Sequence, residues 1–135
     1  MDLDGLKQVN DQLGHREGDR ALVAAAQVLT SCSRSTDLVG RFGGDEFVLL
    51  LSEDAEADQV RARVLATLDA HNARSDSRFE LRLSLGAQIW FPDDATTLAE
   101  PVRRADEQMY ADKQSRPRRA EGVVRVPGAL DSATT

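Results

Sequence analysis

The most informative part of the sequence is Leu38-Val39-Gly40-Arg41-Phe42-Gly43-Gly44-Asp45-Glu46-Phe47-Val48-Leu49-Leu50-Leu51. Two strand-like runs, 38–42 and 47–51, flank a pair of glycines, and glycines supply the positive φ angles that a tight turn needs. The stretch therefore predicts a β-hairpin. The second run is apolar throughout, which predicts a strand that is covered on both faces.

Helical patterns precede and follow this hairpin. Apolar residues spaced three and four apart predict one helix over residues 19–32, with Asp19 as its N-cap, and another over residues 54–71. A capping box at residues 97–100 opens a third helix, which runs to about residue 114.

Strand patterns complete the order of elements. Residues 79–89 alternate strictly between apolar and polar side chains, and residues 1–4 resemble the end of a strand. The order is strand stub, helix, hairpin, helix, strand and helix. It predicts an α+β fold with a mainly antiparallel central sheet covered by helices.

The composition fits one acidic domain. The chain has 135 residues, of which 41% are hydrophobic, and a formal net charge of −6. Length and hydrophobic content suit one domain with a real core. Nucleic acid is disfavoured as a partner, because its binders carry a basic face. An acidic protein that binds a polyanion needs a metal ion to offset the repulsion.

Several features predict a reduced, cytoplasmic chain with no membrane segment. Cys32 is the one cysteine, and its place in a helical apolar pattern predicts a buried structural thiol. No apolar run approaches the ~20 residues that span a bilayer. Acidic residues follow Met1 at once, unlike a signal peptide. Residues 116–135 lose all periodicity and predict a flexible tail.

Three acidic residues adjoin the predicted turn and the strand stub: Asp2, Asp45 and Glu46. If the two strands are neighbours, their carboxylates converge at one end of the sheet. Mg²⁺ takes such oxygens, typically from one or two carboxylates plus substrate phosphates, and paired metals assist nucleotidyl transfer. Gly43 and Gly44 leave the backbone uncovered, so a phosphate can approach main-chain N–H groups. The alternative is a surface hairpin with solvated acids.

The motifs around the hairpin resemble the GGDEF family of diguanylate cyclases. Residues 2–19 match the family's opening pattern D-x-D-x-x-K-x-x-N-D-x-x-G-H-x-x-G-D. The GGDEF hairpin follows at the usual distance. Residues 84–86 match the later S-x-G strand, and Ala105-Asp106, Tyr110 and Lys113 match the final helix. The resemblance covers roughly residues 1–115 as one GGDEF domain.

The resemblance implies a fold and a catalytic centre. The fold is the ferredoxin-like palm of nucleotide cyclases. Asp2 and Asp45 would be ligands of Mg²⁺ or Mn²⁺, with help from the Leu3 carbonyl. Glu46 would be a further acidic group at the metals, helping to deprotonate the attacking 3′-hydroxyl.

The resemblance also assigns substrate contacts. Asn10 and Asp19 would read guanine, because a carboxylate accepts from its N–H groups and an amide serves its acceptor edge. Lys7 and Lys113 would meet the triphosphate, beside Gly43 and Gly44. Without the resemblance, Asn10 is a turn residue, Asp19 is a helix N-cap, and the lysines are solvated.

A second site is implied just before the hairpin. Arg34-Ser35-Thr36-Asp37 resembles the R-x-x-D turn at which this family binds its product and is inhibited. Arginine pairs with phosphate or guanine edges while the aspartate orients it, and Arg61 or Arg63 would add a contact. An Arg-Asp pair is also ordinary loop chemistry. His15 is interpreted as structural rather than catalytic.

Two departures from the family pattern stand out. The family's segment before this point, a helix and most of the first strand, is absent from the sequence, so the first strand and first helix are expected to be incomplete. After Lys113 the family continues with an arginine where this chain has Pro117, which offers no charge. Arg116 or Arg118 would have to replace that arginine.

The resemblance implies a diguanylate cyclase that condenses two GTP into cyclic di-GMP and pyrophosphate, with a product-inhibition site. Because one domain holds one GTP, catalysis would need a homodimer. The alternative is an inactive GGDEF domain that binds cyclic di-GMP or GTP as a sensor. A third possibility is a fragment that does not fold alone.

Overall fold

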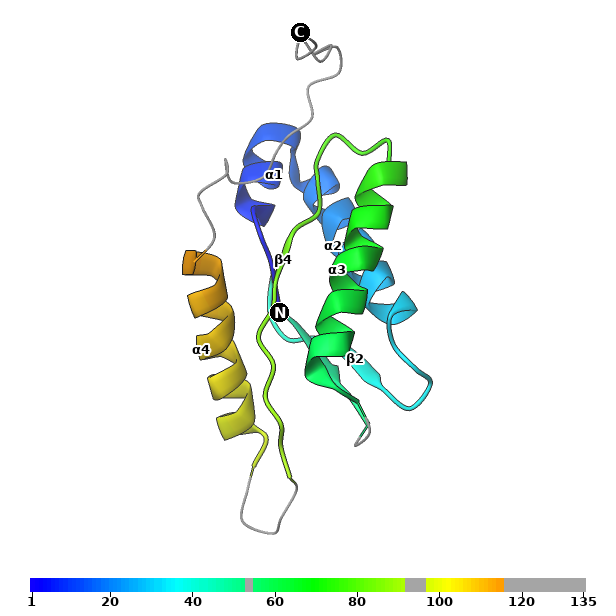
Figure 1. The fold of residues 1–135 in the computed structure, drawn as a ribbon. Coiled ribbons are helices and arrows are strands. Elements are labelled where there is room, and N and C mark those ends of the chain that lie inside the picture. Colours follow the sequence, from blue (N-terminus) through cyan, green and yellow to red (C-terminus); the bar gives the residue numbers. More distant parts are fainter. Residues whose placement is uncertain (53–54, 92–96, 116–135) are drawn as a thin grey trace, which may run out of the picture.

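The computed structural model describes residues 1–52, 55–91 and 97–115 (Figure 1). Within these ranges the chain forms β1 (Asp2–Leu3), α1 (Leu6–Leu13), α2 (His15–Ser31), β2 (Leu38–Arg41), β3 (Phe47–Leu50), α3 (Ala57–Arg74), β4 (Leu83–Ser84) and α4 (Ala99–Ser115). The predicted tail, with Arg116, Pro117 and Arg118, lies outside the described residues, as does the first predicted residue of the second helix, Asp54.

The strands form two antiparallel pairs, β1 with β4 and β2 with β3. The predicted hairpin is confirmed, with a register from Leu38 opposite Leu50 to Arg41 opposite Phe47. An isolated bridge between Asp2 and Glu46 joins β1 to the start of β3. Two pairs of strands thus form one short layer with the hairpin turn beside β1.

The expectation that the second hairpin strand is covered on both faces is wrong. Phe47 is buried and Leu49 packs against the core, whereas Leu50 and its partner Leu38 are exposed. Successive strand residues point to opposite faces. The helices cover only one face of the hairpin near Leu50. The apolar residues of β3 therefore alternate between a covered face and an exposed one.

The helices before the hairpin differ from those that the sequence predicts. The short helix α1 was not predicted, although Leu6, Val9 and Leu13 have helical spacing and Val9 is buried. Gly14, with φ at +91°, ends α1 and directly precedes α2. The prediction that Asp19 is an N-cap is therefore wrong, because α2 begins four residues before it. The later helices lie close to where they were predicted.

Of the strand predicted over residues 79–89, the structure forms the short strand β4 and an isolated bridge at Phe79. The predicted alternation still holds at its start, where Phe79, Leu81, Leu83 and Leu85 are buried. At Leu81 a helix side chain takes the place of a neighbouring strand: Asn72 of α3 accepts from the Leu81 N–H and donates to its carbonyl, each at 2.9 Å. The buried amide thereby satisfies both backbone groups of Leu81.

The core lies between the strands and the pair α2 and α3, while α4 lies on the other side of β4 (Figure 1). Cys32 is buried there, as predicted, and its thiol donates to the Thr67 hydroxyl over 3.2 Å. None of the helices in the described ranges is long and apolar enough for a membrane span.

Candidate functional site

The hairpin turn is held by its own backbone and by one arginine. The Phe42 N–H donates to the Glu46 carbonyl over 2.8 Å. Arg41, the last residue of β2, donates from Nε to the Gly43 carbonyl and from Nη2 to the Gly44 carbonyl, each over 3.0 Å. Sequence reasoning gave Arg41 no role. Its side chain fixes the glycine turn from the strand that leads into it.

Asp2 and Asp45 meet at the point where β1 runs beside this turn. The Leu3 N–H donates to the Asp45 carbonyl over 2.8 Å, which sets the two segments side by side. Burial raises the pKa of Asp2 above its ordinary value, Lys113 opposes that rise, and the Asp45 carboxylate adds to it. Asp2 Oδ1 is buried and has no hydrogen-bond partner among the residues described. The two carboxylates predicted to converge are therefore neighbours.

The third predicted acid, Glu46, does not complete this pair. Its side chain is exposed and bends back over the turn, so that a Cβ atom built on Gly43 would lie 2.9 Å from Glu46 Oε2. Within the described ranges, no three His, Cys, Asp or Glu side chains gather closely enough to hold a metal ion. The structure thus brings together Asp2 and Asp45, while the Glu46 side chain lies over the turn.

The donors present fit Mg²⁺ as a partial site. Mg²⁺ is usually held by one or two carboxylates together with substrate phosphates, rather than by a cage of protein groups. Asp2 offers an unpartnered, buried carboxylate oxygen beside Asp45. The N–H and C=O of a strand residue face the same side, so the Leu3 carbonyl faces the hairpin turn, as its N–H does.

A cation already lies at this corner. Lys113, near the end of α4, places Nζ 3.0 Å from Asp2 Oδ2 and 3.3 Å from Asp4 Oδ1. Burial works to lower the pKa of Lys113, but its hydrogen bonds and charge pairs with Asp2 and Asp4 outweigh that effect and raise it. Asp4 was part of the quoted motif and received no role. The period of two along a strand places Asp2 and Asp4 on the same face, and this signal was available in the sequence.

The predicted guanine readers lie on α1 and α2. Asn10 is a helical residue of α1, so it is not a turn residue. Its side chain packs directly on Gly18, where a Cβ atom would lie 1.7 Å from Asn10 Oδ1. Asp19 is the next residue and is exposed, as is Lys7 on α1. Gly18, which had no assigned role, therefore makes room for Asn10 beside Asp19.

The Arg34–Asp37 turn is ordered by the aspartate. Asp37 Oδ2 accepts from the Arg34 backbone N–H over 2.8 Å, and Oδ1 accepts from the Ser52 N–H over 3.2 Å. These contacts, the Arg34 N–H first, lower the pKa of Asp37. Either Arg61 or Arg63 was expected to add a contact here. Its side chain instead binds the Leu85 carbonyl and Asp112 of α4.

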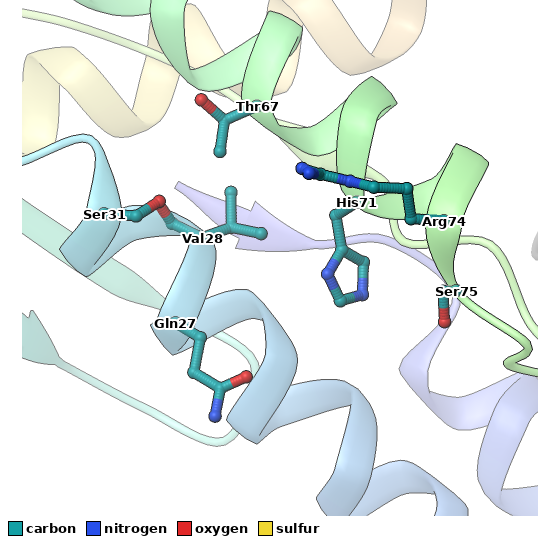
Figure 2. Close-up of a pocket in the computed structure, with 7 residues that line it drawn as sticks. All are labelled: Gln27, Val28, Ser31, Thr67, His71, Arg74 and Ser75. Carbon is teal, nitrogen blue, oxygen red and sulfur yellow. The ribbon is translucent and has the colours of Figure 1, made fainter.

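Other features lie apart from the acidic corner. His15 is exposed at the first residue of α2. A shallow cleft of about 370 Å³ lies between α2 and α3, and Figure 2 shows His71 and Arg74 along it. The remaining lining residues are Gln27, Val28, Ser31, Thr67 and Ser75. None of the predicted site residues lines this cleft.

Comparisons with known proteins identify the family of this chain. A family model described as "Diguanylate cyclase, GGDEF domain" matches residues 1–119. Diguanylate cyclase TpbB of Pseudomonas aeruginosa (strain UCBPP-PA14) is 36% identical over 145 residues, which cover 99% of this chain and 33% of TpbB. Diguanylate cyclase DgcZ of Escherichia coli (strain K12) is 32% identical over 118 residues, 85% of this chain and 39% of DgcZ. The chain thus spans less than half the length of these relatives.

Solved structures give the same result. A shortened TpbB (also called YfiN) comprising only its GGDEF domain matches with a TM-score of 0.71 and 34% identity, covering 85% of this chain and 69% of that one. The GGDEF domain of DgcB from Caulobacter crescentus, solved in complex with c-di-GMP, matches with a TM-score of 0.69 and 25% identity, covering 84% and 68%. The predicted family and the predicted cyclase-like α+β fold are confirmed, and the chain belongs to the GGDEF family of diguanylate cyclase domains.

Proposed function

We propose that the chain is the catalytic domain of a diguanylate cyclase. The 3′-oxygen of one GTP bonds to the α-phosphorus of a second GTP, the bond from that phosphorus to the β-phosphate oxygen breaks, and pyrophosphate leaves. A repeat in the opposite direction closes the ring and gives cyclic di-GMP and a second pyrophosphate. Each hydroxyl loses one proton in the process.

The observation that carries this proposal is the pair Asp2 and Asp45 beside the open turn Gly43-Gly44. Asp2 keeps a buried oxygen without a partner in the described structure, as a cation ligand would before its cation binds. Bound Mg²⁺ or Mn²⁺ would neutralise the triphosphate and stabilise the negative charge on the attacking and leaving oxygens. The glycines leave the backbone N–H groups open to phosphate.

The remaining residues take roles around this centre. Asn10 and Asp19 bind the guanine edge, and Lys7 and Lys113 bind phosphate oxygens. Glu46, whose carboxylate is exposed beside the turn, is proposed to accept the proton of the attacking 3′-hydroxyl after its side chain rotates toward Asp2.

Two facing copies of the domain are needed, because each acidic corner holds one GTP. Catalysis is therefore proposed to require a homodimer, at least while the two nucleotides react. The Arg34–Asp37 turn is proposed to bind cyclic di-GMP and inhibit the enzyme. Its ordered backbone supports this role.

The test is incubation of the purified chain with GTP and Mg²⁺, with products separated by chromatography. Wild type is expected to form cyclic di-GMP. Asp45→Ala is expected to form none, because one of the two adjoining carboxylates is lost, and Glu46→Ala is expected to lose turnover while keeping its fold. Asp69→Asn changes an exposed aspartate on α3 and serves as the control. Turnover at the wild-type rate in Asp45→Ala would refute the proposal.

The second candidate is a domain that binds cyclic di-GMP or GTP without turning it over. The ordered Arg34–Asp37 turn favours it, because that turn is formed independently of the acidic corner. Saturable binding of cyclic di-GMP without product from GTP would support this candidate. Loss of that binding in Arg34→Ala would locate it at the turn.

A further inference from the structure

We propose that Asp4 and Ser84 are positioning residues, which hold the Lys113 ammonium at the acidic corner where it meets the triphosphate. The proposal rests on the proposed function of that corner. Neither Asp4 nor Ser84 is among the proposed cation ligands.

The contacts form a chain from the sheet to the ammonium. Ser84 of β4 is 1% exposed, and its hydroxyl lies 2.8 and 2.9 Å from the two oxygens of Asp4. A buried hydroxyl needs such a partner. Asp4 is thereby fixed, with Oδ1 3.3 Å from Lys113 Nζ, while Asp2 Oδ2 lies 3.0 Å from the same atom.

The helix that carries Lys113 is also seated against this part of the sheet. A Cβ atom on Gly86 would lie only 1.9 Å from the Ala105 carbonyl oxygen, so α4 rests directly on the backbone beyond β4. On the same helix, Asp112 accepts from Arg61 Nη2 over 2.8 Å, and Arg61 Nη1 donates to the Leu85 carbonyl over 3.0 Å. The backbone at Lys113 is thus fixed independently of the ammonium group.

The Lys113 ammonium needs its own partner, because a lysine side chain has four rotatable bonds and loses conformational entropy when it is held in one position. An exposed lysine paired with one carboxylate gains at most about 1 kcal/mol. Here two carboxylates converge on one ammonium, and Asp4 is itself fixed by a buried hydroxyl. Because Asp4 is not a proposed cation ligand, it can hold Lys113 whether or not Asp2 is engaged by a cation. The ammonium then stays beside the phosphates.

The first test uses the fact that the chain has two lysines, Lys7 and Lys113. Nuclear magnetic resonance with ¹³C-labelled lysine resolves both side chains in the full chain, without substrate or turnover. Asp4→Asn keeps an oxygen for the Ser84 hydroxyl and removes the charge that faces Lys113. The pKa of Lys113 is expected to fall in this variant, while that of Lys7 stays unchanged.

Ser84→Ala releases Asp4 without removing its charge, and a smaller fall in the pKa of Lys113 is expected. Asp69→Asn controls for the loss of one negative charge. A thermal melt of each variant checks that it is folded. If Asp4→Asn does not fold, the pKa of Lys113 in Ser84→Ala tests whether Asp4 and Ser84 hold the ammonium. An unchanged pKa of Lys113 in a folded Asp4→Asn or Ser84→Ala variant would overturn the proposal.

The second test is a double-mutant cycle on the KM for GTP. Asp4→Asn is expected to raise KM about five-fold, the value of one well-placed ion pair, with kcat within about two-fold. In a Lys113→Met background, Asp4→Asn is expected to change KM no further, because its effect acts through the lysine. Equal effects in both backgrounds would mean a merely structural role. A chain without turnover would refute the proposed function and leave the lysine titration as the deciding result.

Discussion

Replacing Gly18 with alanine tests whether Asn10 is placed to bind the substrate base. A Cβ atom at residue 18 would lie 1.7 Å from Asn10 Oδ1 and 2.8 Å from Asn10 Cγ. These atoms form the far end of a flexible side chain, so the amide can rotate away while α1 and α2 keep their places. The substitution thus displaces one predicted substrate contact without removing it from the chain.

The structure predicts that Gly18→Ala has a small effect on stability and a larger effect on GTP binding. Gly18 lies inside α2, where alanine is favoured over glycine by about 0.8–1 kcal/mol. That gain offsets the ~0.5–1.5 kcal/mol needed to move a side chain off its rotamer, so the free energy of unfolding changes little. Loss of one neutral hydrogen bond of about 0.5–1.5 kcal/mol raises the KM for GTP roughly two- to ten-fold.

The assay pairs a thermal melt with steady-state kinetics on the same preparations. Gly40→Ala is the matched control, because a Cβ atom there meets nothing within 4 Å. It is expected to leave KM unchanged. An unchanged KM in Gly18→Ala would refute the role of Asn10. A raised KM accompanied by a large loss of stability would show that α1 and α2 had moved instead.

Three further predictions concern stability. Gly86→Ala places a methyl group against the backbone of α4 and is expected to lower the free energy of unfolding by about 1–3 kcal/mol; an unchanged denaturant midpoint would contradict this packing. Asn72→Ala leaves the Leu81 N–H and carbonyl without their partner, and a loss of about 2–4 kcal/mol is expected in the same measurement; less than 1 kcal/mol would show that other groups satisfy them. Because the pKa of Asp37 is lowered in the folded chain, its contribution is complete above its unfolded pKa of about 4 and is lost as pH falls below that value. In an acid titration of wild type, the protection of the Arg34 amide from hydrogen exchange is expected to fall with a midpoint below the unfolded pKa of about 4. Protection at pH 6 that is equal in wild type and Asp37→Ala would contradict the contact.

Local patterns were enough to predict the hairpin and three of the helices. The glycine pair sets the turn, and residues 60, 64 and 68 face the core at helical spacing. The start of α2 was misplaced because Asp19 resembles an N-cap, while the helix begins after Gly14, whose positive φ was not considered. The short helix α1 escaped notice for a similar reason: it has eight residues between two glycines.

The site was predicted less completely than the fold. Asp2 and Asp45 could be paired in advance, because one strand end and one turn bring them to the same edge. The roles of Gly18, Gly86 and Ser84 depend on what approaches them from another element. No pattern along the chain contains that information. Asp4 is the exception, since alternation along the strand already placed it beside Asp2.

The most direct test of the central claim is the ratio of products formed from GTP by the purified chain with Mg²⁺. Cyclic di-GMP is measured by mass and pyrophosphate by an enzymatic assay in the same sample. We predict two pyrophosphates for each cyclic di-GMP, and neither product in Asp45→Ala. Binding of GTP without either product, or release of inorganic phosphate alone, would contradict the claim that this acidic corner joins two nucleotides.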